Sequence, residues 1–136
     1  MRLYLDTAPV IYLVQGTEGF SDAVERAINR SGVELIVSHL TRMECRVLPI
    51  RSGDSALLQD FDRFFSDDVQ ETVSLDAEVM DRATTIRAEY GFSTPDAIHL
   101  ASAVIGQCDI FLTADIDLAR FPDIRVQVVS SEPLAS

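Results

Sequence analysis

The apolar runs of this chain are short and separated by helical patterns, and this alternation limits its fold more than any other feature. We expect strands over residues 2–6, 34–37, 72–75, 110–113 and 126–129. Parallel strands need a crossover connection, which is usually a helix. The alternation therefore predicts an α/β fold, in which helices cover both faces of a parallel sheet.

Capping and terminating residues mark the helices between these strands. Thr7 is expected to cap a short buried helix with Pro9 in its first turn, and Ser21 to open a helix that ends near Arg30. Pro49 should terminate a helix that Ser38 caps. The remaining helices are expected at Asp54 to Phe65, Asp76 to Tyr90 and Thr94 to Ile105.

The length and the charge of the chain restrict its function. Its 136 residues predict one domain over 1–136, with a loose tail from about 130 to 136. The net charge of -11 argues against binding nucleic acid through a general basic surface. All 11 basic side chains are Arg, so mechanisms that need Lys, such as a P-loop or a Schiff base, are excluded.

The cysteines and the hydrophobic runs indicate a location. Cys45 and Cys108 are isolated, in no metal-binding or redox spacing, and Asp6 interrupts the apolar N-terminus before a signal peptide could form. No apolar run approaches the roughly 20 residues of a membrane helix. We expect a protein of the reducing cytoplasm without membrane contact.

Four acids are placed where a strand or helix would present a charge at one end of the sheet: Asp6, Glu44, Asp96 and Asp115. Asp6 and Asp115 follow strands at the sheet edge where open α/β sheets bind ligands. Clustered carboxylates repel one another unless a cation compensates, and ligands that are all oxygen suit Mg²⁺ or Mn²⁺. Each acid also has a plain alternative. Asp6 could begin a turn, Asp96 could serve the helix dipole, Asp115 could cap a short helix, and Glu44 could pair with an Arg.

Four motifs that contain these acids resemble the PIN domain family, and within it the VapC-like toxins of bacterial toxin–antitoxin pairs. The motifs are Leu5-Asp6-Thr7-Ala8-Pro9-Val10-Ile11-Tyr12, Val37-Ser38-x-Leu40-Thr41-x-x-Glu44, Thr94-Pro95-Asp96-Ala97-x-His99-Leu100-Ala101 and Phe111-Leu112-Thr113-Ala114-Asp115. They occur in the family's order and cover nearly the whole chain. One departure is Ala8, where many relatives have Asn or Ser.

The resemblance implies a three-layer sandwich whose five-stranded parallel sheet has the order 3-2-1-4-5. It also implies a Mg²⁺- or Mn²⁺-dependent endoribonuclease that acts as a toxin, is neutralised by a small antitoxin and forms a homodimer. The metal-binding acids would be Asp6, Glu44, Asp96 and Asp115, with Asp117 a candidate fifth. The alternatives are a PIN-fold nuclease outside a toxin pair, in RNA processing or directed at DNA, and a non-catalytic metal- or protein-binding module.

Other side chains are candidates for supporting roles. The hydroxyls of Thr7, Thr41 and Thr113 could orient a carboxylate or a water, although for Thr41 and Thr113 local backbone bonding is an equal alternative. An Arg strip, Arg42, Arg46 and Arg51, could guide RNA, or could be a solvated helix face.

The histidines and one aromatic helix complete the set of candidates. We expect His99 to be a structural residue bonded to the backbone or to an acid, and His39 to be solvated. Phe61, Phe64 and Phe65 are expected to leave an exposed groove for the helix of an antitoxin, whose Arg or Lys would enter the acidic pocket.

Overall fold

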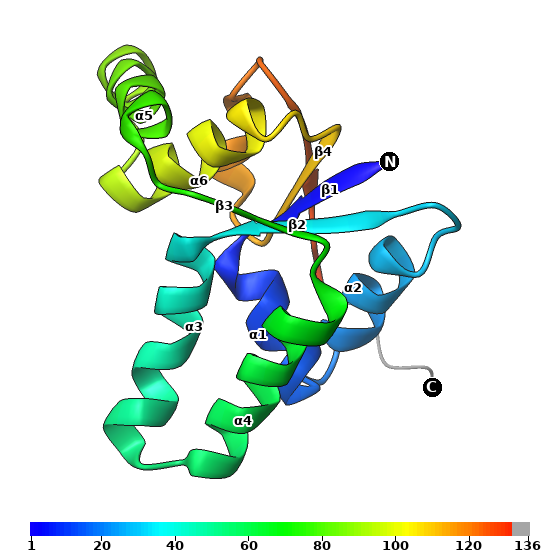
Figure 1. Ribbon diagram of the computed structural model, residues 1–136. Coiled ribbons are helices and arrows are strands. Elements are labelled where there is room, and N and C mark those ends of the chain that lie inside the picture. The colour runs from blue at the N-terminus through cyan, green and yellow to red at the C-terminus, as the bar shows by residue number, and fades with distance from the viewer. Residues whose placement is uncertain (132–136) are drawn as a thin grey trace.

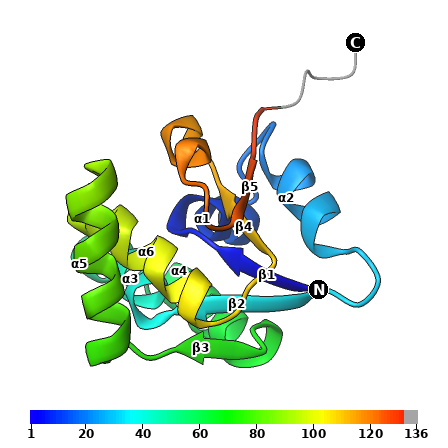
Figure 2. The same cartoon turned by 90° about the horizontal axis from the view of Figure 1, so that it is seen from above.

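The computed structural model describes residues 1–131, which form a parallel β-sheet with helices on both faces (Figure 1, Figure 2). The five strands have the order β3-β2-β1-β4-β5, and all four neighbouring pairs are parallel. The predicted fold class and strand order are therefore confirmed. The strands are β1 Arg2–Leu5, β2 Glu34–Ser38, β3 Glu71–Val73, β4 Ile110–Thr113 and β5 Arg125–Val128.

Six α-helices connect the strands and divide between the two faces of the sheet. Figure 1 shows α1 to α4 on one side and α5 and α6 on the other, with α3 and α4 as a hairpin that extends away from the sheet. A π-helix continues α4 over Phe64–Asp68, and a 3₁₀ helix follows β4 over Ile116–Arg120. The α-helices are α1 Thr7–Gln15, α2 Ser21–Ile28, α3 His39–Ser52, α4 Ser55–Arg63, α5 Ala77–Tyr90 and α6 Thr94–Ile105.

The sheet separates two hydrophobic cores because successive side chains of a strand point to opposite faces. In β1, Leu3 and Leu5 pack with the residues of α1, α2 and α4, whereas Tyr4 packs with those of α5 and α6. Tyr4 is fully buried and stacks on Phe111 of β4, with 5.2 Å between the ring centroids. Both faces of the central strands are thus buried, as expected for a parallel sheet under two helical layers.

Several predicted boundaries were wrong. The strand expected over 2–6 ends at Leu5, and the cap of α1 is Asp6 rather than Thr7, because the Asp6 carboxylate accepts the backbone N–H of Thr7. The helix that Pro49 was expected to terminate continues to Ser52. Proline removes only its own N–H donor, and the chain turns at Gly53, whose φ of 70° is left-handed.

The aromatic cluster of α4 also differs from its prediction. Phe61, Phe64 and Phe65 belong to the core beneath the sheet and are at most 9% exposed, so they do not form an exposed groove as a set. The helix that carries them does not end at Phe65, since the π-helix carries the chain to Asp68. Ser130 and Ser131 lie in no helix or strand, and the rest of the expected loose tail lies outside the described residues.

Candidate active site at the carboxyl edge of the sheet

The strand order brings the predicted acids to one edge of the sheet. β1 and β4 are adjacent and parallel, so Asp6, which follows β1, and Asp115, which follows β4, emerge at the same edge. The Asp6 N–H continues the ladder by donating to the carbonyl of Leu112 at 2.9 Å. Glu44 comes to this edge on α3 and Asp96 on the first turn of α6.

Asp6 is more enclosed than Glu44, because 13% of the Asp6 side chain is exposed and 30% of the Glu44 side chain. Its Oδ1 accepts the backbone N–H of Thr7 at 2.8 Å, and its Oδ2 accepts the hydroxyl of Thr113 at 2.8 Å. The first bond caps α1 and the second ties Asp6 to the end of β4. The expected role of Thr113 in orienting a carboxylate is therefore seen in the hydrogen bond to Asp6.

Asp96 lies in the first turn of α6, whose cap is the Ser93 hydroxyl. Burial raises the pKa of the Asp96 carboxyl, and the negative charges of Asp6 and Asp115 raise it further. The Ser93 hydrogen bond and the charge of His99 act in the opposite direction without cancelling the increase. Asp6, Asp96 and Asp115 therefore share one electrostatic environment, although the sequence places them on three separate segments.

Asp115 is exposed and caps the 3₁₀ helix that follows β4, because its Oδ1 accepts the N–H of Asp117 at 2.9 Å. Its own N–H donates to the Thr113 hydroxyl at 3.1 Å. Thr113 thereby connects the carboxylate of Asp6 with the backbone of Asp115. The plain alternative for Asp115, a helix cap, describes its contacts correctly and leaves one carboxylate oxygen for another ligand.

Glu44 is held by two donors at a single oxygen atom. Its Oε1 accepts the hydroxyl of Thr7 at 2.7 Å and lies 2.6 Å from Nε2 of His99. Burial alone would raise the pKa of the Glu44 carboxyl, but the hydrogen bonds from His99 and Thr7 lower it below its usual range. Glu44 therefore stays charged in this structure, and its partner is a histidine from α6 rather than the Arg of its plain alternative.

His99 belongs to the site more closely than the sequence indicated. The prediction of a buried residue bonded to an acid is confirmed, but that acid is Glu44, and the Oδ1 of Asp6 lies 3.6 Å from the same Nε2 atom. The other ring nitrogen, Nδ1, lies 2.8 Å from the hydroxyl of Tyr4. Tyr4 was not among the candidates. The one sequence signal for His99 was its position three residues after Asp96, on the same side of α6.

The other candidates make contacts of a different kind. Asp117 is exposed and paired with Arg120 at 2.9 Å, which lowers the pKa of its carboxyl through a hydrogen bond. Arg46 is paired with Asp62 of α4 at 2.8 Å. The Thr41 hydroxyl accepts the N–H of Ser38 at 3.3 Å, which is the local backbone bond given above as its alternative, and it lies 3.4 Å from the Tyr4 hydroxyl. His39 is exposed, as expected.

The type of ligand at this edge fits a divalent metal ion, but the arrangement of the ligands does not form a ready binding site. Carboxylates after β1, in the first turn of α6 and after β4 fit a hard divalent cation. Burial raises the pKa of Asp96 most, and the charges of Asp6 and Asp115, which a cation would offset, raise it further. Among residues 1–131, however, no three His, Cys, Asp or Glu side chains are arranged as the ligands of one ion. A cation would thus have to draw Asp6, Asp96 and Asp115 closer than they stand.

Comparison with known proteins agrees with this architecture. A model of the PIN domain family matches residues 3–124. A search among curated proteins gives no significant match. A chain of the VapBC2 complex of Rickettsia felis, solved with a promoter DNA fragment, superposes with a TM-score of 0.78 at 13% identity, covering 96% of this chain and 100% of that one.

Two further solved structures have the same fold. DNA-bound VapBC from Salmonella typhimurium gives a TM-score of 0.74 at 19% identity, with 94% of this chain and 98% of the other covered. VapC20 of Mycobacterium tuberculosis, a toxin that cleaves the sarcin–ricin loop, gives 0.70 at 18% identity, with 90% and 98% covered. The family match and the shared fold together show that this chain belongs to the PIN domain family.

Proposed function

We propose that this protein is a Mg²⁺- or Mn²⁺-dependent endoribonuclease and the toxin of a toxin–antitoxin pair. The observation that carries the proposal is the placement of Asp6 and Asp115 after two adjacent parallel strands, with Asp96 in the first turn of α6, at the carboxyl edge of a PIN-domain sheet. An uncompensated cluster of carboxylates destabilises a fold, so its presence at a ligand-binding edge favours a cation-dependent function. The likeness to VapC structures supports the toxin class.

The residues divide into ligands and orienting groups. Asp6 and Asp96 would hold the cation directly, while Asp115 and the Oε2 atom of Glu44 would orient water beside it. Thr113 fixes Asp6 by its hydrogen bond to Oδ2, and Thr7 fixes Glu44 by its hydrogen bond to Oε1. When bound, the cation would activate water for attack on a phosphodiester and stabilise the charge that develops on the phosphate.

The metal and the substrate are tested together. Purified protein is incubated with matched fluorescent RNA and DNA oligonucleotides in EDTA and again after Mn²⁺ is restored. We expect RNA to be cleaved only after Mn²⁺ is added, with internal cuts. Cleavage in EDTA would contradict the metal dependence, and equal cleavage of DNA would favour the alternative of a DNA-directed nuclease. Tight Mn²⁺ binding without cleavage of any nucleic acid would favour the non-catalytic binding module.

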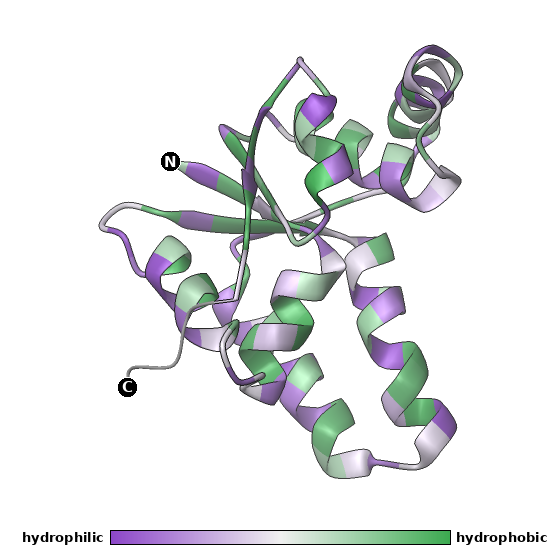
Figure 3. Ribbon diagram, turned by 180° about the vertical axis from the view of Figure 1, so that it is seen from behind, coloured by the Kyte–Doolittle hydropathy of each residue, from purple (hydrophilic) through white to green (hydrophobic). Residues whose placement is uncertain are grey.

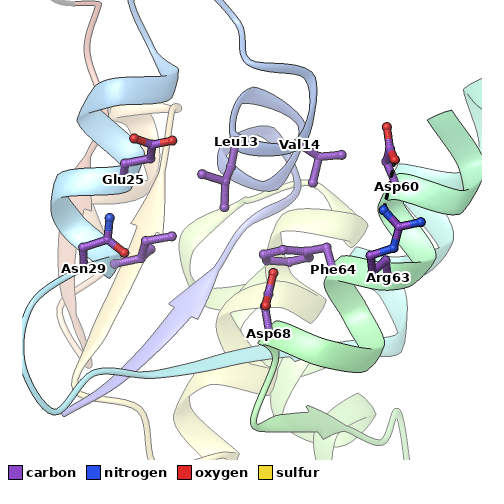
Figure 4. Close-up of a pocket in the computed structure, with 9 residues that line it drawn as sticks. Leu13, Val14, Glu25, Asn29, Asp60, Arg63, Phe64 and Asp68 are labelled. Atoms are coloured by element: carbon purple, nitrogen blue, oxygen red, sulfur yellow. Dashed lines mark ion pairs between the residues drawn. The ribbon is translucent and has the colours of Figure 1, made fainter. Parts of the chain in front are cut away.

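A groove between α1, α2 and the end of α4 is the site that we propose for the antitoxin. Figure 4 shows Leu13 and Val14 of α1 facing Phe64 across this space, with Glu25, Asp60 and Asp68 at the rim. The apolar floor suits the hydrophobic face of an amphipathic helix, and the acidic rim of a chain with net charge -11 suits basic residues on that helix. Phe64 lines this groove although it is only 5% exposed, and the predicted three-phenylalanine surface is absent from the described residues.

This proposal is tested with the product of the small gene next to the toxin gene. Val14→Asp should weaken its binding by about tenfold or more, since it places a charge in the apolar floor. Met80→Asp, on the opposite helical layer, is the matched control because Met80 is also partly exposed. Equal loss in both variants, or no loss in either, would contradict the assignment of this groove.

We propose the exposed face of α3 for the homodimer contact. Three of the seven exposed large hydrophobic side chains in residues 1–131 lie on one face of this helix: Met43, Val47 and Ile50. Figure 3 shows hydrophobic stretches of this helix beside hydrophilic ones. Arg42 and Arg51 flank the apolar side chains and suit the acidic surface of a second copy, so this face fits a protein partner better than the predicted RNA contact. Val47→Asp should convert a dimer to a monomer in sedimentation experiments, and an unchanged dimer would exclude this face.

A further inference from the structure

A continuous chain of hydrogen bonds runs from the buried side of the sheet to Glu44. It begins at the Tyr4 hydroxyl, which lies 2.9 Å from the Ser38 hydroxyl and 2.8 Å from Nδ1 of His99. It continues from Nε2 of His99 to Oε1 of Glu44 at 2.6 Å. Tyr4 is fully buried and the side chain of His99 is 2% exposed, whereas that of Glu44 is 30% exposed at the mouth of the site.

The chemistry of these groups fixes the protons along part of the chain. An ionised carboxylate can only accept hydrogen bonds, so the short contact with Glu44 requires a hydrogen on Nε2 of His99. On the other side of the ring, the Tyr4 hydroxyl is the hydrogen-bond partner of Nδ1. The histidine ring is therefore held at both nitrogens, between a strand of the sheet and a helix on the opposite face.

The same contacts select one oxygen of Glu44. Oε1 receives the Thr7 hydroxyl as well as the His99 ring and is thereby saturated, since a carboxylate oxygen has two lone pairs. Oε2 remains as the atom that can meet a further ligand. We propose that Tyr4 and His99 are positioning residues that lock Glu44 with Oε1 turned to the protein and Oε2 presented to the acidic site. This inference rests on the proposed metal-dependent function for its purpose, but not for its geometry.

Tyr4 and His99 offer unusually selective substitutions. Tyr4→Phe keeps the ring that stacks on Phe111 and removes the hydroxyl, with Tyr90→Phe as the matched control. Gln places an amide N–H near the position of Nε2, so His99→Gln retains a donor for Glu44. The shorter Asn side chain reaches only the position of Nδ1. His99→Asn therefore retains a hydrogen-bond partner for Tyr4 and loses the hydrogen bond to Glu44. Asn and Gln at position 99 have similar polarity, so comparing them distinguishes the hydrogen bond to Tyr4 from the hydrogen bond to Glu44.

Two measurements, neither of which is nuclease activity, test the proposal. Long-range ¹H–¹⁵N NMR reports the hydrogen on each ring nitrogen, and the chain has only two histidines to assign. We expect Nε2 of His99 to carry a hydrogen in the wild type, and the ring signals to shift in Glu44→Gln and in Tyr4→Phe but not in Tyr90→Phe. An Nε2 atom without hydrogen, or signals that do not respond to Glu44→Gln, would overturn the proposal.

Mn²⁺ affinity, measured by electron paramagnetic resonance, is the second readout. Loss of groups that orient a metal ligand typically costs 10–100-fold in affinity. We expect His99→Asn to lose about tenfold or more and His99→Gln to stay within about threefold of the wild type. Folding of each variant is checked by circular dichroism. Equal losses for Asn and Gln, or no loss for Asn, would overturn the positioning role.

The two readouts also distinguish this inference from the proposed function. If the wild-type protein binds no Mn²⁺, the metal-dependent function fails, while the NMR result still decides whether the chain from Tyr4 to Glu44 exists. If Mn²⁺ binds and His99→Asn behaves as the wild type, the metal site stands and the positioning role is wrong.

Discussion

The Thr113 hydroxyl donates a 2.8 Å hydrogen bond to Oδ2 of Asp6 and so joins the carboxyl ends of β4 and β1. Thr113 is fully buried and accepts the N–H of Asp115 at the same hydroxyl. One hydroxyl thus fixes two of the acids in the proposed site. The spacing of the motif does not reveal this bond, because Asp6 and Thr113 are 107 residues apart.

Two substitutions of Thr113 should distinguish the contribution of this hydrogen bond to stability from that of side-chain packing. Thr113→Val keeps the shape of the side chain and leaves Asp6 Oδ2 without its donor, so we expect a loss of about 1.5–3 kcal/mol in the free energy of unfolding. Thr113→Ser keeps the hydroxyl and should lose less. Urea denaturation of both variants measures the difference. Equal losses would mean that the methyl group, and not the hydroxyl, is the important contact.

Asp96→Asn should alter stability in a manner that depends on pH. Burial, reinforced by the charges of Asp6 and Asp115, raises the pKa of Asp96 in the folded protein. The wild type therefore loses stability as the pH rises through that value, whereas Asn has no carboxyl group to ionise. In EDTA, the melting temperature of the variant minus that of the wild type should therefore increase as the pH rises from the ordinary carboxyl range to neutral. A difference that stays constant with pH would contradict the shared environment of Asp6, Asp96 and Asp115.

Adding Mn²⁺ should stabilise the wild-type protein, because a ligand that binds only the folded state does so by about 2.7 kcal/mol at 100 times its Kd. The comparison is an Asp6→Asn/Asp115→Asn double variant. Both residues cap helices, and Asn retains a capping oxygen while it removes the charge. The variant should fold but show little shift in its melting temperature with Mn²⁺. Equal shifts in the two proteins would indicate binding to general surface charge.

The two thiols should be unreactive in the folded protein. Burial raises the pKa of both Cys45 and Cys108 to about 12, so almost no thiolate is present at neutral pH. Native protein treated with an alkylating reagent should be modified slowly at either position, and unfolded protein should be modified rapidly at both. Rapid modification of Cys45 without unfolding would show that α3, which carries it, opens readily.

The sequence predicted the elements of this fold better than their ends. Apolar strands separated by capped helices lead to the observed sheet, because period and capping are local signals. The errors have tertiary causes. α3 passes Pro49, which is buried, and the π-helix after α4 places Phe64 and Phe65 in the core. Local residue patterns do not contain that information.

The candidate site was predictable in its acids and not in its hydrogen bonds. Asp6, Asp96 and Asp115 each stand at or near the start of a helix, and Glu44 lies in the second turn of α3, which a pattern of caps and motifs can reveal. Tyr4 reads as an ordinary apolar strand residue, and its contact with His99 joins β1 to α6 across 95 residues. Only the packing of α6 on the sheet shows that this tyrosine reaches the site.

Cleavage of RNA by paired single-charge variants tests the central claim most directly. Asp96→Asn is compared with Asp123→Asn, which removes an exposed carboxylate paired with Arg82 outside the acidic edge. Both are assayed with the same labelled RNA in saturating Mn²⁺, after their folding is verified. We expect Asp123→Asn to cleave at the wild-type rate and Asp96→Asn to be slower by at least about 100-fold, because Asn lacks the charge that holds a hard cation. Cleavage by Asp96→Asn at the wild-type rate would contradict the assignment of this site.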